Sequence, residues 1–374
     1  MHCHPEHDVS GDLRVRQLHV ERLRNIDAVD LSLSDGQNLL VGGNGQGKTT
    51  LLEALYLLGA VRSFRGARPL ELVQHGAREA VVRGTLGAQE PASTIVIALT
   101  KQGRTIKVDG KRADLAEHFR RFPMVAFHPG DLELVLGGPS ARRRFLDRML
   151  FQAEAGYARW FREYRRALQS RNELLKQEGS DRELHAYDRV LAALGSRMGS
   201  ARARLVVKLD EATTTILEAL GVEPFSVRLR SSVEPDEPAL LAALERSLHA
   251  DRRRGRTTVG PHTDELELLR PTGLARVVAS RGEARALAVS MRLGEREVVS
   301  SCAVATPLLL LDDVWAELDA DRAERVLDLV TAEPGQVVVT GTGRHQPRAV
   351  TGWRRFEVRQ GSVTSSSKNE TDLV

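Results

Sequence analysis

A glycine-rich segment places the strongest constraint on the fold of this chain. Residues 42–49 read GGNGQGKT, which satisfies the pattern GxxxxGK[ST] of a phosphate-binding loop. The residues before it, Gln37–Val41, are predicted to form a short apolar strand, and residues 48–59 carry leucines at helical spacing. A strand, a glycine turn and a helix in this order are the context that the motif requires. The sequence therefore predicts an α/β fold of the P-loop nucleotide-binding class, with a chance match in a turn as the competing interpretation.

Each residue type in this loop has a chemical reason. Glycines at 43, 45 and 47 let successive backbone N–H groups point inward, and the following helix adds the positive end of its dipole. Lys48 is expected to neutralise the β- and γ-phosphates of ATP, and the hydroxyl of Thr49 is expected to hold Mg²⁺. The predicted ATP contacts in this segment are Gly42, Gly43, Asn44, Gly45, Gln46, Gly47, Lys48, Thr49 and Thr50.

A pair of acids follows a second apolar run. A P-loop protein that hydrolyses nucleotide also needs a carboxylate at the tip of a neighbouring buried strand. Residues 308–311 are four leucines, which is typical of a central parallel strand buried on both faces, and Asp312 and Asp313 follow directly. We assign Asp312 to magnesium and Asp313 to the positioning or activation of the attacking water. The alternative is that the two acids only cap the next helix.

The excess of positive charge lies in the middle of the chain. The net charge is +4, but residues 139–256 contain 23 Lys and Arg against 17 Asp and Glu, so the remainder is slightly acidic. The arginines at 252, 253, 254 and 256 are our candidates for contacts with the phosphates of a nucleic acid, and a solvated helical face is the competing interpretation. The triple arginine at residues 142–144 is expected to be partly structural.

The composition excludes several classes of protein. Two cysteines, Cys3 and Cys302, cannot form a disulfide framework or a four-ligand zinc site. No apolar run approaches the ~18 residues of a membrane span, and the polar N-terminal segment has no signal-peptide core. We therefore expect a protein of the reducing cytoplasm with no membrane partner.

The central part of the chain is predicted to be helical. Residues 140–221 carry apolar positions at helical spacing, and the glycines in this stretch are expected to interrupt the helices. We therefore expect no long coiled coil. The glycines in question are Gly156, Gly179, Gly195 and Gly199.

Two further stretches resemble motifs of ABC-type ATPases. Residues 313–319 (DVWAELD) resemble the D-loop that follows the acidic strand, and residues 280–283 (SRGE) resemble a degenerate ABC signature. In that superfamily, the signature of one subunit closes on the γ-phosphate held by another, so the resemblance adds Ser280 and Gly282 to the predicted ATP contacts. Taken alone, SRGE would also serve as a helix N-cap with a capping acid.

Six stretches together carry a resemblance to a known family: LRNI (23–26), GGNGQGKT (42–49), FHPGDLELVLGGPSARRRFLD (127–147), VGPHTDEL (259–266), SRGE (280–283) and LLLLDDVWAELD (308–319). Through them, the chain from about residue 13 to residue 360 resembles the RecF family, bacterial DNA replication and repair ATPases in the SMC-like branch of the ABC type.

The resemblance implies an ATPase head interrupted by a mainly helical lobe. It also implies ATP-dependent homodimers, slow DNA-stimulated hydrolysis of ATP, and binding to duplex DNA near single-strand gaps, with RecO and RecR assisting the loading of RecA. The expected organisation is a flexible tail (1–12), the head's first part (13–138), the inserted lobe (139–256), the head's second part (257–361) and a second flexible tail (362–374).

The chain departs from the wider ABC pattern at three positions, and the first two departures are expected to slow turnover. Thr340 stands where transporters have a switch histidine, and it is expected to sense the γ-phosphate more weakly. Asp313 stands where many ABC enzymes have Glu, and Glu283 stands where Gln is common. Two other hypotheses stay open. A transporter ATPase subunit would have a shorter interval between Lys48 and Asp312, and a small-molecule kinase would lack the signature and the D-loop.

Overall fold

The computed structural model describes residues 13–87, 92–342 and 350–366, which divide into two compact units. Of these residues, the first unit holds those up to Leu132, Ile216–Glu223 and those from Ser280 onward. The second unit holds Glu133–Thr215 and Pro224–Ala279. The predicted tail at 1–12 lies outside the described residues.

A mainly parallel sheet of six strands carries the phosphate-binding loop. Its order is β15-β14-β3-β13-β12-β8, and every neighbouring pair is parallel except β14 and β15. β12 is buried along its whole length, as four consecutive leucines predict for a strand covered on both faces. The strands are β3 (Gln37–Val41), β8 (Met124–Phe127), β12 (Leu308–Leu311), β13 (Val337–Gly341), β14 (Arg354–Arg359) and β15 (Ser362–Ser366).

A second sheet of the first unit is entirely antiparallel, in the order β2-β1-β4-β5-β6-β7. In β4 and β5, buried and more exposed positions alternate, because successive side chains of a strand point to opposite faces. The strands are β1 (Arg14–Leu23), β2 (Ile26–Ser32), β4 (Glu79–Gly87), β5 (Ser93–Thr100), β6 (Gly103–Val108) and β7 (Lys111–Arg112).

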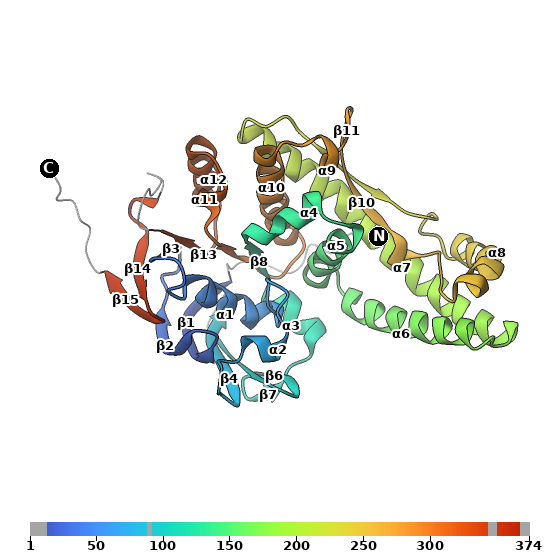
Figure 1. Ribbon diagram of the computed structural model, residues 1–374, viewed down its shortest axis with the longest axis horizontal. Coiled ribbons are helices and arrows are strands. Elements are labelled where there is room, and N and C mark those ends of the chain that lie inside the picture. Colours follow the sequence, from blue (N-terminus) through green and yellow to red (C-terminus); the bar gives the residue numbers. More distant parts are fainter. Residues whose placement is uncertain (1–12, 88–91, 343–349, 367–374) are drawn as a thin grey trace. The chain divides into compact units, whose positions relative to one another are not determined.

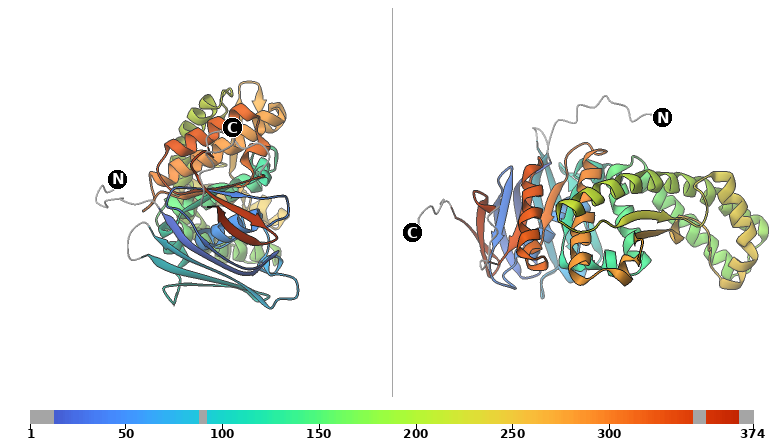
Figure 2. Two further views of the ribbon diagram at one scale, coloured as in Figure 1. Left: turned by 90° about the vertical axis from the view of Figure 1, so that its left-hand side faces the viewer. Right: turned by 90° about the horizontal axis from the view of Figure 1, so that it is seen from above.

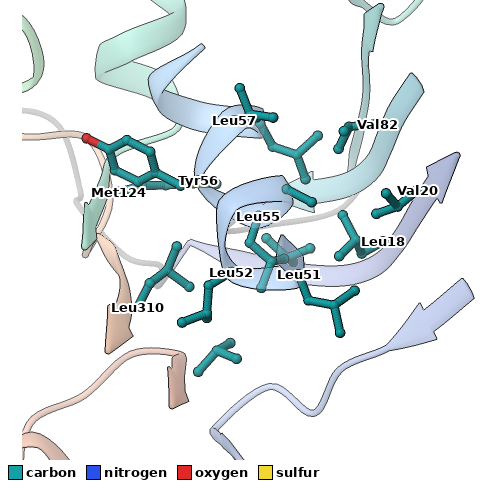
Figure 3. Packing of buried hydrophobic residues seen from close by; sticks show 14 of the residues in the cluster. Leu18, Val20, Leu51, Leu52, Leu55, Tyr56, Leu57, Val82, Met124 and Leu310 are labelled. Atoms are coloured by element: carbon teal, nitrogen blue, oxygen red, sulfur yellow. The ribbon is translucent and has the colours of Figure 1, made fainter. Parts of the chain in front are cut away.

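The helix after the phosphate-binding loop, α1 (Lys48–Ala60), packs between these two sheets (Figure 3). Leu51 and Leu55 are completely buried in one hydrophobic cluster with Leu18 of the antiparallel sheet and Leu310 of the parallel sheet. Each fully buried leucine stabilises the fold by about 1.5–3 kcal/mol. The N-terminus of α1 is therefore held firmly at the end of β3.

Of the remaining helices of the first unit, α10 packs on β8 and α11 on β13, whereas α2 packs on the antiparallel sheet (Figure 1). α10 begins with a capping box, in which Ser280 and Glu283 bond each other's backbone N–H groups. The helices are α2 (Pro69–Leu72), α3 (Leu115–Arg121), α10 (Arg281–Ser300), α11 (Val314–Glu317) and α12 (Ala320–Ala332), with a 3₁₀ turn, η1, at Pro129–Asp131.

The second unit combines helices with a three-stranded antiparallel sheet, β11-β10-β9. A buried arginine, Arg202, ties it together by bonding the carboxylates of Asp147 and Asp264 at 2.7 and 2.8 Å. Its elements are α5 (Pro139–Ala153), α6 (Tyr157–Lys176), β9 (Ser226–Arg230), α8 (Glu237–Arg254), η2 (Pro261–Thr263), β10 (Glu265–Arg270), β11 (Gly273–Leu274) and α9 (Ala275–Val278). Two helices also reach into the first unit, α4 (Leu132–Leu136) and α7 (Asp181–Ala219).

The expected helix interruption at Gly195 and Gly199 is wrong, because α7 runs through both as one helix of 39 residues (Figure 2). These glycines let other segments of the second unit approach the helix closely. A Cβ at Gly199 would lie 2.7 Å from Pro235, and one at Gly195 would lie 3.3 Å from Pro261. Gly156 and Gly179 do lie outside helices.

Four of the expected assignments differ from the structure. Residues 133–138, expected in the head, belong to the second unit, and residues 216–223, expected in the lobe, belong to the first. Residues 257–279 belong to the second unit, because β10 pairs with β9 and fixes this stretch beside the inserted residues. Residues 362–366 are not a tail but form β15, which pairs with β14 and packs Val363 against the core. The rest of the expected tail, 367–374, lies outside the described residues.

Over the described ranges, we find no helix that combines the length and the apolar character needed to cross a bilayer.

Candidate nucleotide-binding site

The predicted loop joins β3 to α1 and is shaped by its glycines. Gly45 and Gly47 have φ angles of 76° and 112°, a left-handed region that other residues rarely adopt. Gly42 lies directly against the carbonyl oxygen of Val358 and leaves no space for a Cβ. A larger residue at any of these three positions would change the path of the loop.

Lys48 lies at the first turn of α1, with only 8% of its surface exposed. Its Nζ donates hydrogen bonds to the carbonyl oxygens of Gly42 at 2.7 Å and Gly43 at 2.9 Å. Burial lowers the pKa of the Lys48 ammonium, and the nearby Asp313 and Asp312 oppose that shift. The loop therefore holds a cationic group in place over its own backbone.

The structure brings Thr49 and Asp312 together, as predicted. The hydroxyl of Thr49 donates to Oδ1 of Asp312 at 3.0 Å, and the two residues are 263 positions apart in the chain. Asp312 is 6% exposed. Burial raises the pKa of its carboxyl group, while hydrogen bonds from Thr340 and Thr49 act in the opposite direction. These hydroxyls stabilise the charged form of Asp312 inside the protein.

Asp313 has a strained backbone and an unsatisfied oxygen. Its φ angle is 51°, which is unusual for a residue other than glycine. Among the described residues, its Oδ1 is buried with no hydrogen-bond partner. Burial raises the pKa of this carboxyl group, and Lys48 opposes the shift. Strain of this kind is often retained at functional sites, where the surrounding structure holds it.

Thr340, the expected weak sensor of the γ-phosphate, is bonded to both acids. It is fully buried at the end of β13, where its hydroxyl donates to Asp312 and accepts from the N–H of Asp313. The hydroxyl therefore acts both as a donor and as an acceptor, and both bonds position the two acids.

Asn25 supports the loop and was assigned no role from the sequence alone. It lies in the two-residue turn between β1 and β2, where its Nδ2 donates to the carbonyl oxygen of Gly45 at 3.0 Å. Its Oδ1 accepts from the hydroxyl of Thr50 at 2.8 Å. The neighbouring Arg24 bonds both carboxylate oxygens of the buried Glu53 on α1. The LRNI stretch of the resemblance was the signal that pointed to this turn.

His128 is a second residue that the sequence analysis missed. It directly follows β8, which pairs in parallel with β12, so it reaches the same edge of the sheet as Asp312. Its charge lowers the pKa of the Asp312 carboxyl, although this is a smaller effect than burial. The ring stacks on Phe64 with centroids 5.2 Å apart. Only the strand order reveals that His128 belongs to this site.

The predicted signature lies at the N-terminus of α10 in the same unit. Ser280 is exposed, and its hydroxyl accepts from the N–H of Glu283 at 3.2 Å. Gly282 has no close neighbour except the end of Arg322, 3.6 Å from a built Cβ. The structure gives Ser280 no hydrogen bond to the described loop residues.

The predicted D-loop begins at the second of the two acids, Asp313. Asp313 is the N-cap of α11, and the indole of Trp315 packs against Gly341 so closely that no Cβ could be added there. Asp319 is the N-cap of α12 and accepts from the N–H of Arg322 at 3.0 Å.

The predicted DNA-contacting arginines lie at the end of α8 in the second unit. Arg252 bonds the carboxylate of Asp181 at 2.6 Å and the carbonyl oxygen of Gly179 at 2.8 Å. In contrast, Arg253, Arg254 and Arg256 are exposed and have no ion pair within the described part of the chain.

Arg142 and Arg143 have the structural role expected of them. The buried Arg142 bonds Glu265 at 2.7 Å, and Arg143 bonds the carbonyl oxygen of Asp264 at 2.8 Å. Both contacts lie within the second unit, so these arginines stabilise its fold.

The residues of the site fit a magnesium-bound nucleotide. The hydroxyl of Thr49 and a carboxylate oxygen of Asp312 are close enough to share one cation, and Asp313 offers an unsatisfied oxygen beside Lys48. No group of three or more His, Cys, Asp or Glu within the described ranges is arranged to hold a metal alone. Mg²⁺ commonly binds one or two protein oxygens and completes its shell with phosphates and water, so Thr49 and Asp312 would suffice to hold it.

Comparison with known proteins gives likenesses over nearly the whole chain. Residues 14–361 match the family model described as the RecF/RecN/SMC N terminal domain. The chain is 39% identical to the DNA replication and repair protein RecF of Myxococcus xanthus, covering 88% of this chain and 91% of that protein. It is 36% identical to the RecF of Anaeromyxobacter dehalogenans (strain 2CP-1), covering 94% and 99% respectively.

Solved structures give the same result for the fold. A structure described as the recombination mediator protein RecF-ATP in the RecFOR pathway matches with a TM-score of 0.86 and 30% identity, covering 95% of this chain and 100% of that chain. An Smc head domain from Pyrococcus furiosus, 18% identical and with a TM-score of 0.56, covers 95% of this chain and 96% of its own. The predicted fold class, a P-loop ABC-type ATPase head with an inserted helical lobe, is confirmed.

Proposed function

Since this chain belongs to the RecF family of DNA replication and repair proteins, we propose that it is an ATP-gated DNA clamp of recombinational repair. ATP binding drives two heads together on duplex DNA near single-strand gaps, and slow hydrolysis to ADP and phosphate releases them. In this role the protein assists the loading of RecA together with RecO and RecR, as the description of its RecF relatives within the RecFOR pathway suggests.

The convergence of Lys48, Thr49 and Asp312 is the observation that carries this proposal. These three residues meet at one edge of the parallel sheet, although the acid comes from a distant part of the sequence. A cationic group, a hydroxyl and a carboxylate in one place provide what a magnesium–triphosphate complex needs. A protein that only bound an uncharged ligand would have no use for this combination.

Each residue has a defined role in nucleotide binding and hydrolysis. The loop N–H groups and Lys48 bind the β- and γ-phosphates, and Thr49 and Asp312 hold Mg²⁺. The metal supplies charge neutralisation when it is bound. Asp313 orients the attacking water with its unsatisfied oxygen, and Thr340 keeps both acids in position. Asp313 is one methylene shorter than Glu, which supports slow turnover.

Dimerisation is assigned to the N-terminus of α10. Ser280 is exposed there, and the helix of 20 residues directs its positive dipole end outward. A hydroxyl and a helix N-terminus are suited to a γ-phosphate, so Ser280 and Gly282 contact the nucleotide held by a second copy of the chain. ATP bound between the two heads then holds them together.

DNA binding is assigned to a basic surface of the second unit. One face of α6 presents Arg162, Arg165, Arg166 and Lys176, with a single acid, Glu173, around an open hollow of about 670 Å³. The end of α8 lies beside it, because Asn172 of α6 accepts hydrogen bonds from Thr257. The exposed Arg253, Arg254 and Arg256 therefore extend the same surface, which suits a phosphate backbone.

Sedimentation of the full chain with and without ATP tests the proposal. We expect a shift from monomer to dimer on adding ATP and Mg²⁺, and a faster turnover of ATP when duplex DNA is present. Equal dimer content in both conditions would exclude ATP gating. Stimulation of turnover by a small phosphate acceptor in place of DNA would favour a kinase.

A further inference from the structure

The turn that joins β14 to β15 is bonded to the phosphate-binding loop. The N–H of Gln360 donates to Oε1 of Gln46 at 2.6 Å, and the N–H of Gly361 donates to the carbonyl oxygen of Gln46 at 2.9 Å. Two successive N–H groups of the turn therefore hold both the side chain and the main chain of a single loop residue.

Close packing accompanies these hydrogen bonds. A Cβ at Gly361 would lie 2.9 Å from the carbonyl oxygen of Asn25, and a Cβ at Gly47 would lie 3.5 Å from the Cα of Gly361. Gly42 at the other end of the loop lies against Val358 of β14. The hairpin thus follows the loop from its first residue to its last glycine.

The strand order explains this placement. β14 pairs in parallel with β3, and Glu357 lies opposite Val41, the last residue before the loop. The turn at 360–361 therefore emerges at the same sheet edge as the loop. Its two residues have φ angles of 47° and 78°, which produce the sharp reversal that directs both N–H groups towards Gln46.

We infer that the Gln360–Gly361 turn is a latch that holds the phosphate-binding loop in its ATP-binding shape before nucleotide arrives. A loop with four glycines in six residues would otherwise lose much conformational freedom on binding ATP. Holding it in the bound shape reduces that cost and strengthens binding. Gln360 and Gly361 are therefore positioning residues for ATP. This inference rests on the ATP binding proposed above.

The substitution Gly361→Ala, compared with Gly352→Ala, tests the latch in the full chain. Gly352 also has a positive φ, 88° against 78°, but a Cβ added there meets nothing within 4 Å. Both variants carry the same backbone strain, and only the first displaces the latch. We expect Gly361→Ala to raise the Kd and the KM for ATP about tenfold and to leave kcat within about twofold. Gly352→Ala should change none of these constants.

A second variant guards against a loss of folding in the first. Gln46→Leu keeps the approximate size of the side chain and removes the acceptor for Gln360, so we expect the Kd for ATP to rise about threefold. Because both changes release the same latch, the double variant should bind ATP no more weakly than Gly361→Ala alone.

The outcomes separate the latch from the proposed function. If the unaltered chain does not bind ATP, the proposed function fails. If it binds ATP and Gly361→Ala lowers only the melting temperature, with an unchanged Kd, the latch is overturned. Fully additive losses in the double variant would also overturn it.

Discussion

The hydroxyl of Thr340 donates a hydrogen bond of 2.8 Å to Oδ1 of Asp312 across the ends of two parallel strands. The same hydroxyl accepts a bond of 2.9 Å from the N–H of Asp313. One buried group therefore fixes the carboxylate that we assign to magnesium and the backbone of the residue that we assign to water. Thr340, which stands at the switch position, therefore holds the two acids in place.

Replacing Thr340 with Val should slow ATP hydrolysis about tenfold. Val has the same shape, but it leaves the N–H of Asp313 without a partner, which costs about 1–3 kcal/mol for a buried group. The Mg²⁺ concentration needed for half-maximal turnover should also rise, since Asp312 loses a bond that favours its charged form. Steady-state ATPase assays across a magnesium titration measure both effects. Thr340→Ser keeps the hydroxyl and should retain most of the activity, and equal losses in both variants would contradict this role.

Replacing Ser280 with Arg should abolish the ATP-dependent dimer. Ser280 is exposed, and among the described residues its side-chain hydrogen bond is the one within its own capping box, so the long side chain is tolerated in the monomer while obstructing the approach of a second head. The monomer should bind ATP with unchanged affinity. Sedimentation measures the dimer, and a fluorescent ATP analogue measures the affinity. A variant that still dimerises with ATP would remove Ser280 from the interface.

Replacing Arg253 and Arg254 with Ala should weaken the binding of duplex DNA of any sequence. Each arginine that contacts a phosphate releases a counterion, so the slope of log K against log salt should fall by about 2 for the pair. Fluorescence anisotropy at several salt concentrations measures this slope. The matched control is Lys111→Ala with Arg112→Ala, an exposed pair on β7 of the first unit with the same total charge. Equal losses from both pairs would mean that the effect is one of overall charge alone.

The stability of the first unit should fall in mild acid because of His118. Burial lowers the pKa of this imidazole to about 4, against 6.5 in the unfolded chain, while Nε2 bonds the carbonyl oxygen of Leu58 at 2.8 Å. The unfolded state therefore binds more protons between these values, and the stability contributed above pH 6.5 is lost as the pH falls to 4. The loss is roughly 3 kcal/mol at most.

Urea unfolding at a series of pH values measures this dependence. The variant His118→Gln can still donate to Leu58 and does not titrate, so its free energy of unfolding should change less over the same window. An identical pH dependence in the two proteins would show that protonation of His118 does not cause the loss of stability.

The phosphate-binding chemistry was predictable because it is local. Residues 42–49 are contiguous, and their glycines, lysine and threonine act through the backbone path of a single loop. The burial of the leucines in β12 and α1 was predictable for the same reason, because a short run or repeat of apolar residues indicates it. The predicted strand at Gln37–Val41 matches β3 at both ends for the same reason.

The predictions from sequence were wrong where glycines were assumed to break helices and where a polar chain end was assumed to be a tail. Gly195 and Gly199 permit close packing within a continuous helix, and only the positions of Pro261 and Pro235 reveal this. Residues 362–366 look polar and tail-like, yet their backbone completes the edge of a sheet. Hydrogen bonds to a neighbouring strand can stabilise a segment whose side chains give no signal.

The sequence by itself determined that this chain has a P-loop, a pair of acids and the family to which it belongs. The tertiary structure alone decided how these parts are held: Thr340 on Asp312, Asn25 on Gly45, and Gln360 on Gln46 across 314 positions. The physical reason is the order of the strands. Strands β14, β3, β13 and β12 are neighbours in the sheet but distant in the chain, so contacts at their ends follow from topology, which no local pattern encodes.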